Sequence, residues 1–288
     1  MTAINARQRT SDDHEAGGEA GTQPSRPVVE VEDVTVAFGA EGSPHRVVAL
    51  QNASLRINKG ELVSLIGPSG CGKSSLLNII GGLAKATSGR VLVDGEPVTG
   101  PSPRKIAYVF QENTLYPWKT VIENVKLGMT FQGVPRAERD DRAADALKTV
   151  GMTSFAHHYP SQLSGGMKQR VQLARALSLQ TEILLMDEPF AALDEQTRMV
   201  LGEELSILLA KTGKTIIFVT HSLVEAVFLA DRIAVFSVRP GRIMAELVVD
   251  EAHPRRPEFM MAPKLHKLRD ELYGLLREEI KKTIEISQ

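Results

Sequence analysis

The sequence predicts an α/β fold with a parallel sheet at its core, an antiparallel β subdomain and a helical subdomain. Three observations support this prediction. Short apolar runs are typical of buried parallel strands, two longer segments alternate apolar and polar residues as half-exposed antiparallel strands do, and helix-forming residues are concentrated near the middle of the chain. The 288 residues, 42% of them hydrophobic, are enough for a full core and a subdomain.

Strands dominate the first part of the chain. Residues 28–38 and 47–57 alternate as antiparallel strands do, and residues 60–67 form a short apolar run that predicts a buried parallel strand leading into a helix. Within residues 89–98 an Asp-Gly pair predicts the turn of a hairpin.

Helices and strands alternate in the second part. Residues from about 112 to 165 are expected to form the helical subdomain, residues 182–189 and 215–222 predict two more buried strands, each followed by a helix, and residues 232–247 predict a second hairpin. Residues 251–288 are expected to form a C-terminal helical extension with its leucines on one stripe: Leu265, Leu268, Leu272, Leu275 and Leu276. Such a stripe packs on its own domain or faces a partner, and both interpretations stay open.

Composition excludes several classes of function. A net charge of −1 gives no support to nucleic-acid binding through a basic surface. The single cysteine, Cys71, excludes an intrachain disulfide and fits a reducing cytoplasm. No apolar run reaches the roughly 18 residues of a membrane span, so work at a membrane would require another chain. Residues 1–27 are polar and acidic without an apolar signal segment, and we interpret them as a disordered tail.

A phosphate-binding loop follows the predicted strand at residues 60–67. Its sequence, GPSGCGKS, fits the pattern G-x-x-x-x-G-K-[ST] and precedes a helix. In such a loop the N–H groups cradle phosphates, Lys73 reaches the β- and γ-phosphates and Ser74 binds Mg²⁺. Cys71 is either a small residue that fits the loop or a redox group. The expected nucleotide contacts are Gly67, Pro68, Ser69, Gly70, Cys71, Gly72, Lys73, Ser74 and Ser75.

Two adjacent carboxylates end the apolar run ILLM. Because neighbouring carboxylates repel each other, this placement needs either a solvated turn or a metal and a water. Beside a phosphate loop, we expect Asp187 to hold Mg²⁺ and Glu188 to accept a proton from the attacking water.

His221 and Gln111 also follow apolar runs. His221 comes one helix and one strand after the carboxylates, so it should emerge at the same carboxyl edge of the sheet, where ligands of open α/β sheets bind. We expect it to orient water or the γ-phosphate, although a lone strand-end histidine is often structural. Gln111 could reach Mg²⁺ or water, but by itself a glutamine is an ordinary surface residue.

A second candidate anion site begins at Ser164. The stretch SQLSGGMKQRVQLARALS places this N-cap before Gly165 and Gly166 and an apolar helical repeat. A glycine-rich helix N-terminus binds anions. The chain therefore contains two predicted phosphate sites far apart in sequence.

These residues together resemble the nucleotide-binding subunit of ABC transporters, over about residues 28–250. The family's motifs occur in order: the aromatic residue Phe38, Walker A at 67–74, the Q-loop residue Gln111, the signature at 163–167, Walker B at 183–188, the D-loop residue Asp194 and the switch histidine His221. Two residues depart from the family. Phe38 replaces the usual tyrosine and keeps the ring face that stacks on adenine, and the signature is LSGGM instead of LSGGQ.

The resemblance implies a P-loop NTPase core of the ABC type that binds ATP and Mg²⁺ and hydrolyses ATP. Two copies would face each other, each closing its signature over the other's ATP. By this resemblance Ser164, Gly165, Gly166 and Asp194 are further nucleotide-binding residues. Transmembrane permease subunits would be separate chains, a substrate-binding protein outside the membrane would deliver the ligand, and this subunit would lie peripherally on the cytoplasmic face of the membrane.

The stretches LYPWKTVIENV and SVRPGRI further resemble the nitrate, sulfonate and taurine import subfamily. By this resemblance Trp118 contacts the permease, although a core or rim position is the alternative. The identity of the transported anion cannot be read from this sequence, because none of these residues contacts the transported molecule. Three rival functions stay open: the ATPase of an exporter or lipid-transfer system, a regulatory ABC ATPase, and a nucleotide sensor, which the presence of both Glu188 and His221 disfavours.

Overall fold

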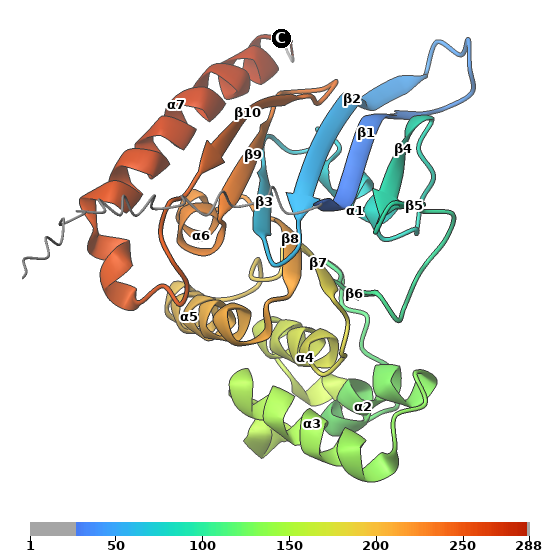
Figure 1. Ribbon diagram of the computed structural model, residues 1–288, viewed down its shortest axis with the longest axis vertical. Coiled ribbons are helices and arrows are strands. Elements are labelled where there is room, and N and C mark those ends of the chain that lie inside the picture. Colours follow the sequence, from blue (N-terminus) through green and yellow to red (C-terminus); the bar gives the residue numbers. More distant parts are fainter. Residues whose placement is uncertain (1–26, 287–288) are drawn as a thin grey trace, which may run out of the picture.

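The structure of this protein is a computed structural model that describes residues 27–286. The predicted tail of residues 1–27 lies outside this range except for Pro27, which begins the first strand, β1 (Pro27–Phe38). Two sheets form the body of the fold (Figure 1).

The first sheet is antiparallel and has four strands in the order β2-β1-β4-β5. Most buried residues of β1 alternate with more exposed ones, as the apolar–polar pattern predicts, and this sheet is the predicted antiparallel subdomain. An Asp94-Gly95 turn joins β4 to β5, with both residues at positive φ, as such hairpin turns require. The remaining strands are β2 (Val47–Asn58), β4 (Ser88–Val93) and β5 (Glu96–Pro97).

The second sheet has six strands in the order β10-β9-β3-β8-β7-β6. All neighbours are parallel except β10, which pairs antiparallel with β9 as the predicted second hairpin. The central strands β3, β7 and β8 are buried at every residue, as expected for a sheet covered on both faces. The bounds are β3 Leu62–Ile66, β6 Ile106–Val109, β7 Ile183–Asp187, β8 Thr215–Val219, β9 Arg232–Phe236 and β10 Ile243–Val248.

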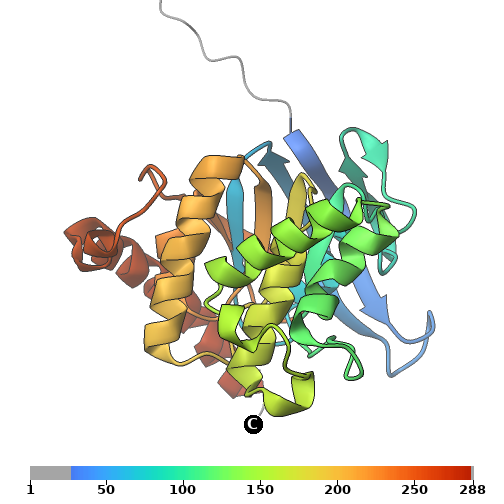
Figure 2. The same ribbon diagram turned by 90° about the horizontal axis from the view of Figure 1, so that it is seen from below.

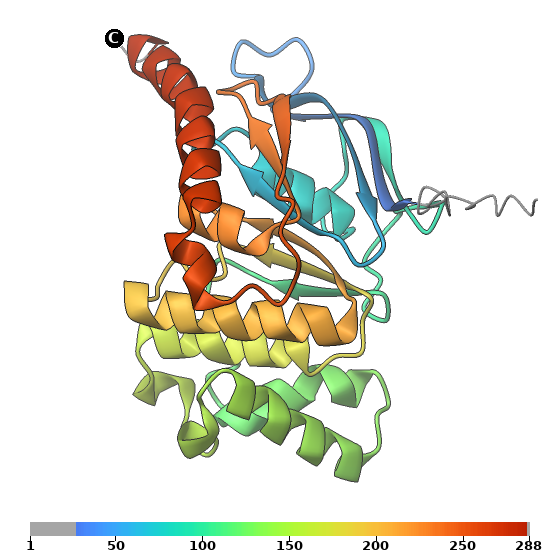
Figure 3. The same ribbon diagram turned by 60° about the vertical axis from the view of Figure 1, so that its left-hand side comes forward.

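Helices cover the two faces of this sheet. On one face of the sheet lie α1 (Lys73–Ile80) and the antiparallel sheet, which share a core with it. On the other face lie α4 (Gly165–Leu177), α5 (Glu195–Thr212) and α6 (Leu223–Leu229). Figure 2 shows α4 and α5 crossing in front of the strands. The helices α2 (Val121–Phe131) and α3 (Arg136–Thr149) form the outermost layer at the end away from the antiparallel sheet (Figure 3).

Short 3-10 turns complete the described chain at Thr153–Phe155, Pro160–Gln162 and Pro257–Met261. After them comes α7 (Pro263–Ile286), which runs alongside α6 and β9. Its leucine stripe packs on its own chain, because Leu265, Leu272 and Leu276 are buried in the main core. Of the two interpretations of this stripe, packing on its own domain is therefore confirmed.

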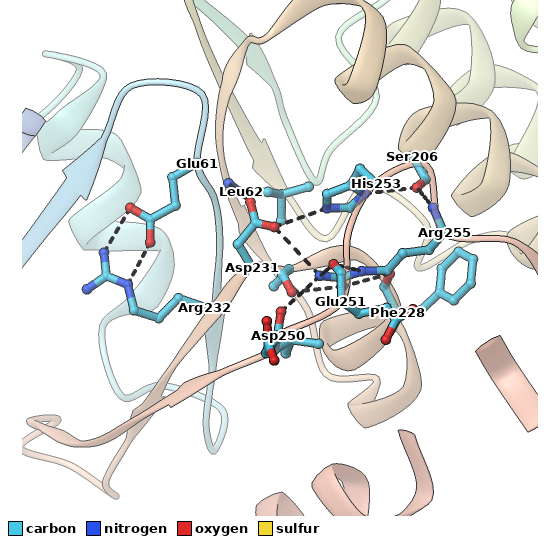
Figure 4. Close-up of polar contacts among 12 residues, drawn as sticks. Glu61, Leu62, Ser206, Phe228, Asp231, Arg232, Asp250, Glu251, His253 and Arg255 are labelled. Atoms are coloured by element: carbon cyan, nitrogen blue, oxygen red, sulfur yellow. Dashed lines mark hydrogen bonds and ion pairs between the residues drawn. The ribbon is translucent and has the colours of Figure 1, made fainter. Parts of the chain in front are cut away.

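A buried arginine fastens the segment between β10 and α7 (Figure 4). Arg255 is 2% exposed, and its guanidinium donates hydrogen bonds to the carbonyl oxygens of Phe228 and Ala230 at the end of α6. Burial lowers the pKa of Arg255 to about 10. The nearby Asp231 carboxylate accepts a hydrogen bond from the N–H of Leu62 and is paired with His253. These contacts tie the C-terminal extension to the start of β3, the strand that leads into the phosphate loop.

Candidate functional site

The phosphate loop joins the end of β3 to the start of α1. Gly70 and Gly72 have φ of 74° and 94°, a left-handed conformation that side chains other than glycine rarely adopt. Gly67 lies so close to β9 that an added Cβ would come within 2.8 Å of Phe236. Lys73 is 5% exposed, and its ammonium donates to the carbonyl oxygens of Gly67 and Pro68, at 2.8 Å each. The glycines therefore give the loop the compact shape that phosphate binding needs.

A cavity of about 710 Å³ opens above this loop. Of the predicted site residues, ten line it: Phe38, Ser69, Gly70, Gly72, Lys73, Ser74, Ser75, Gln111, Glu188 and His221. Gly67, Pro68 and Cys71 belong to the loop without lining the cavity. Cys71 is 1% exposed, which favours the small packed residue over the redox role, because reactive thiols need access.

Asp187 is the last residue of β7 and lies beside the phosphate loop. Its carboxylate accepts a 3.0 Å hydrogen bond from the Ser74 hydroxyl. Burial raises the pKa of Asp187, the Ser74 hydrogen bond lowers it, and the neighbouring Glu188 charge raises it further. Two adjacent oxygen donors, one of them an anion that burial destabilises, match the ligands that Mg²⁺ takes from protein.

Glu188 is the centre of the polar cluster at this sheet edge. Its carboxylate contacts His221 Nε2 at 2.7 Å and accepts a 3.1 Å hydrogen bond from Gln111 Nε2. Its backbone φ of 47° lies in the left-handed region, which costs energy for a residue other than glycine. The structure therefore brings together three side chains that follow the ends of β6, β7 and β8, at the carboxyl edge where the sequence places Glu188 and His221.

Gln169 is a functional candidate that the sequence did not reveal. It lies on α4, is 4% exposed, donates to the backbone oxygen of Glu188 at 3.0 Å and accepts from the N–H of Ala192 at 2.9 Å. This amide links the helix that begins at Ser164 to the strained backbone of Glu188. Its only signal in the sequence is a polar side chain on the buried face of a helix.

Phe38 ends β1 at the open side of the cavity. The ring is 56% exposed and lines the cavity together with Val47 and Ala49 of β2. An exposed ring beside two small apolar side chains offers a flat apolar surface of the kind on which bases stack. The lining also includes Arg239, from the loop between β9 and β10, which the sequence did not single out as a site residue.

The second predicted anion site lies outside this cavity. Ser164 caps α4, and its hydroxyl accepts from the N–H of Met167 at 3.3 Å, as predicted for an N-cap. Ser164 and Gly165 are exposed and Gly166 is partly exposed, and none of them lines the cavity. Asp194 also lies outside it. Its carboxylate accepts from Thr197, and these hydrogen bonds hold the pKa of Asp194 below its ordinary value.

Fold and site together define a phosphate-loop nucleotide-binding protein with an acidic residue and a histidine at the carboxyl edge of its sheet. The profile of the family described as ABC transporter matches residues 50–191. The chain belongs to the ABC transporter family as one of its ATP-binding subunits, and it is an ATPase.

Several relatives match nearly the whole chain. An uncharacterized ABC transporter ATP-binding protein of Methanocaldococcus jannaschii is 45% identical over 89% of this chain and 94% of its own. A nitrate import ATP-binding protein of Synechocystis is 44% identical over 86% of this chain and 95% of its own. A taurine import ATP-binding protein of Rhizobium johnstonii is 42% identical over 86% of this chain and 96% of its own.

A solved structure also matches the fold. It is a dimeric ATP-binding cassette in a post-hydrolysis state bound to ADP and phosphate, with a TM-score of 0.70 and 37% identity over 77% of this chain and 99% of that one. Within residues 27–286 of the present chain, no helix is both long and apolar enough to cross a membrane.

Proposed function

We propose that this chain is the ATP-hydrolysing subunit of an ABC importer and energises the uptake of a small anion through a separate permease. The observation that carries the proposal is the contact of Glu188 with both His221 and Gln111 in the cavity above the phosphate loop. A carboxylate held by two polar side chains beside a phosphate site has the geometry of a general base for water.

The phosphate loop binds the nucleotide in this proposal. Phe38 stacks on adenine, Lys73 reaches the β- and γ-phosphates, and the loop N–H groups hold the phosphate oxygens. The Ser74 hydroxyl, the Asp187 carboxylate and the amide oxygen of Gln111 would hold Mg²⁺, which when bound neutralises phosphate charge. The 3.0 Å contact between Ser74 and Asp187 supports this pair as ligands, because it places two oxygen donors together.

Hydrolysis then follows from the cluster around Glu188. A water oxygen attacks the γ-phosphorus, the bond from that phosphorus to the bridging oxygen breaks, and Glu188 accepts the proton that the water loses. His221 and Gln111 keep the carboxylate and the water in line with the phosphate. The products are ADP and phosphate.

A second copy of the chain completes the site. Ser164, Gly165 and Gly166 offer the N-terminus of a 13-residue helix to an anion, and they lie outside their own chain's cavity. We propose that they close over the partner's γ-phosphate, with Asp194 at the same interface. The dimeric form of the similar cassette supports this arrangement. Loss of the γ-phosphate on hydrolysis then lets the two copies separate.

The helical subdomain carries the contact with the permease. Trp118 is 70% exposed and packs edge-on to Tyr116, with ring centroids 5.4 Å apart. Exposed aromatic pairs are enriched at protein interfaces. This contact would hold the chain at the cytoplasmic face of the membrane, where the permease transmits the cycle to a ligand delivered by a substrate-binding protein.

Nitrate and taurine, or a related aliphatic sulfonate, are the proposed cargoes, since relatives named for nitrate and taurine import match more than 85% of this chain. The test is uptake of labelled nitrate and taurine by cells that lack the chain, with the wild-type or the Glu188→Gln gene restored. We expect uptake of one anion to fall in the deletion and to return only with the wild type. Undiminished uptake of both anions in the deletion strain would contradict the proposed cargoes.

A further inference from the structure

The loop between β9 and β10 lies over the phosphate loop. This loop, residues 237–242, carries Arg239, whose exposed side chain lines the same cavity as Lys73 (Figure 1 shows the two strands). The Arg239 Nε donates a 3.1 Å hydrogen bond to the carbonyl oxygen of Gly70. A Cβ added to Gly70 would come within 2.6 Å of Nη2. The guanidinium therefore lies directly against the middle of the phosphate loop.

Backbone contacts on two sides hold this loop in position. Gly241 sits on the carbonyl group of Cys71 so closely that a Cβ there would overlap it, and only glycine fits. Its N–H and carbonyl oxygen bond to Ala49 and Gln51 of β2, at 2.8 and 2.9 Å. On the other side, the N–H of Val238 donates at 2.8 Å to Glu279 of α7, which is 5% exposed. The position of Arg239 is thus fixed by β2 and α7 together.

The charge of Arg239 is not neutralised by the residues around it. Two arginines on either side of this loop in the chain have a carboxylate close by: Arg232 bonds to Glu61, and Arg255 lies near Asp231. Among residues 27–286, no carboxylate lies within ion-pair distance of Arg239, and its terminal amino groups make no hydrogen bond. A planar guanidinium with free donors, beside a phosphate-binding loop, is suited to two hydrogen bonds with phosphate oxygens.

We propose that Arg239 binds the phosphate chain of the nucleotide, at the oxygens held by the middle of the loop. This inference rests on the nucleotide site proposed above and adds a residue to it. The N–H groups of such loops hold the α- and β-phosphates. A contact opposite Gly70 therefore serves ADP as well as ATP, so ADP alone is a sufficient probe.

The experiment measures ADP affinity by calorimetry in the presence of Mg²⁺, on the full chain. We expect Arg239→Gln to weaken ADP binding by about tenfold, the usual scale for a hydrogen bond to a charged group. The ADP affinity of Arg239→Lys should lie between those of the wild type and Arg239→Gln, because lysine keeps the charge and loses the paired donors. Arg242→Gln is the matched control, since Arg242 is exposed in the same loop, bonds to Gln51 and does not line the cavity.

Salt dependence separates a phosphate contact from a merely structural one. If Arg239 binds phosphate by charge, the affinity ratio between wild type and Arg239→Gln shrinks as salt rises. A ratio that stays constant with salt, or an equal loss in Arg242→Gln, would assign Arg239 a structural role and overturn the proposal. Unchanged ADP affinity in Arg239→Gln would also overturn it. Failure of the wild type to bind ADP would instead contradict the nucleotide site itself.

Discussion

Replacing Glu188 by glutamine removes the proposed general base with little change of shape. The side-chain oxygen of glutamine can still accept the hydrogen bond from Gln111, which is 3.1 Å long in the wild type. Its amide group can donate to His221 Nε2, now 2.7 Å from the carboxylate. The phosphate loop, the cavity and the backbone contacts should all persist in this variant. ATP binding is therefore expected to stay near its wild-type affinity.

The loss of hydrolysis follows from what is removed. Only the proton acceptor disappears, and a positioned general base is worth about 10²- to 10⁴-fold in rate. Because His221 and Gln111 would still hold the water in the proposed mechanism, we expect a loss near the lower end, at least about 10²-fold. This loss corresponds to about 2.7 kcal/mol in the activation free energy.

The assay measures phosphate release at saturating ATP and Mg²⁺, alongside ATP affinity on the same preparation. Glu182→Gln is the matched control, because that carboxylate lies just before β7, is 61% exposed and pairs with the surface residue Lys59. It should keep wild-type turnover. If Glu188→Gln retains more than a tenth of the wild-type rate, another group activates the water and the assignment of Glu188 is wrong.

Four further predictions concern separate parts of the molecule. Lys73→Ala should abolish measurable ATP binding in a calorimetric titration, and near-normal affinity and turnover would contradict the phosphate-loop assignment. Arg255→Met should lower the free energy of unfolding, measured in urea, by about 3–5 kcal/mol, because the buried carbonyl oxygens at the end of α6 lose their hydrogen-bond donor. A change below about 1 kcal/mol would show that water replaces the guanidinium as donor. Asp231 is partly buried, which acts to raise its pKa, but the paired His253 imidazole and a hydrogen bond from the N–H of Leu62 hold that pKa below its ordinary value. A carboxyl group with a lowered pKa stabilises the fold at neutral pH and loses this effect as pH falls through that pKa. The difference in free energy of unfolding between the wild type and Asp231→Asn should therefore disappear below about pH 4. A difference that is constant with pH would refute this prediction. Deletion of residues 1–26 should leave ATPase turnover unchanged, and a large loss would overturn the interpretation of that segment as a tail.

Much of the fold was predictable because its signals are local. The strands β3, β7 and β8 are buried at every residue and appear in the sequence as short apolar runs. The Asp-Gly turn, the N-cap of α4 and the leucine stripe of α7 are likewise patterns of neighbouring residues. The meeting of Glu188 and His221 followed from one rule, that parallel strands present their carboxyl ends at one edge, whereas Gln111 was expected there only from the family resemblance.

The remaining site features depend on contacts between distant segments. Arg239 reaches Gly70 only because β9 pairs with β3, which no local pattern specifies. Gln169 reaches the backbone of Glu188 because of how α4 packs on the sheet. The left-handed backbone of Glu188 is set by its surroundings, since its side chain alone disfavours that conformation. Such features require the assembled fold.

The dimer around two nucleotides is the central claim, and light scattering tests it most directly. Purified Glu188→Gln protein would be measured with and without saturating ATP and Mg²⁺. We predict that ATP doubles the mass of this protein and that adding Ser164→Arg prevents the doubling. The control is Ser154→Arg, the same change at an exposed position elsewhere in the helical subdomain, which should leave the doubling intact. A mass that stays that of a single chain with ATP, or doubling that survives Ser164→Arg, would contradict the claim that this helix terminus binds the partner's nucleotide.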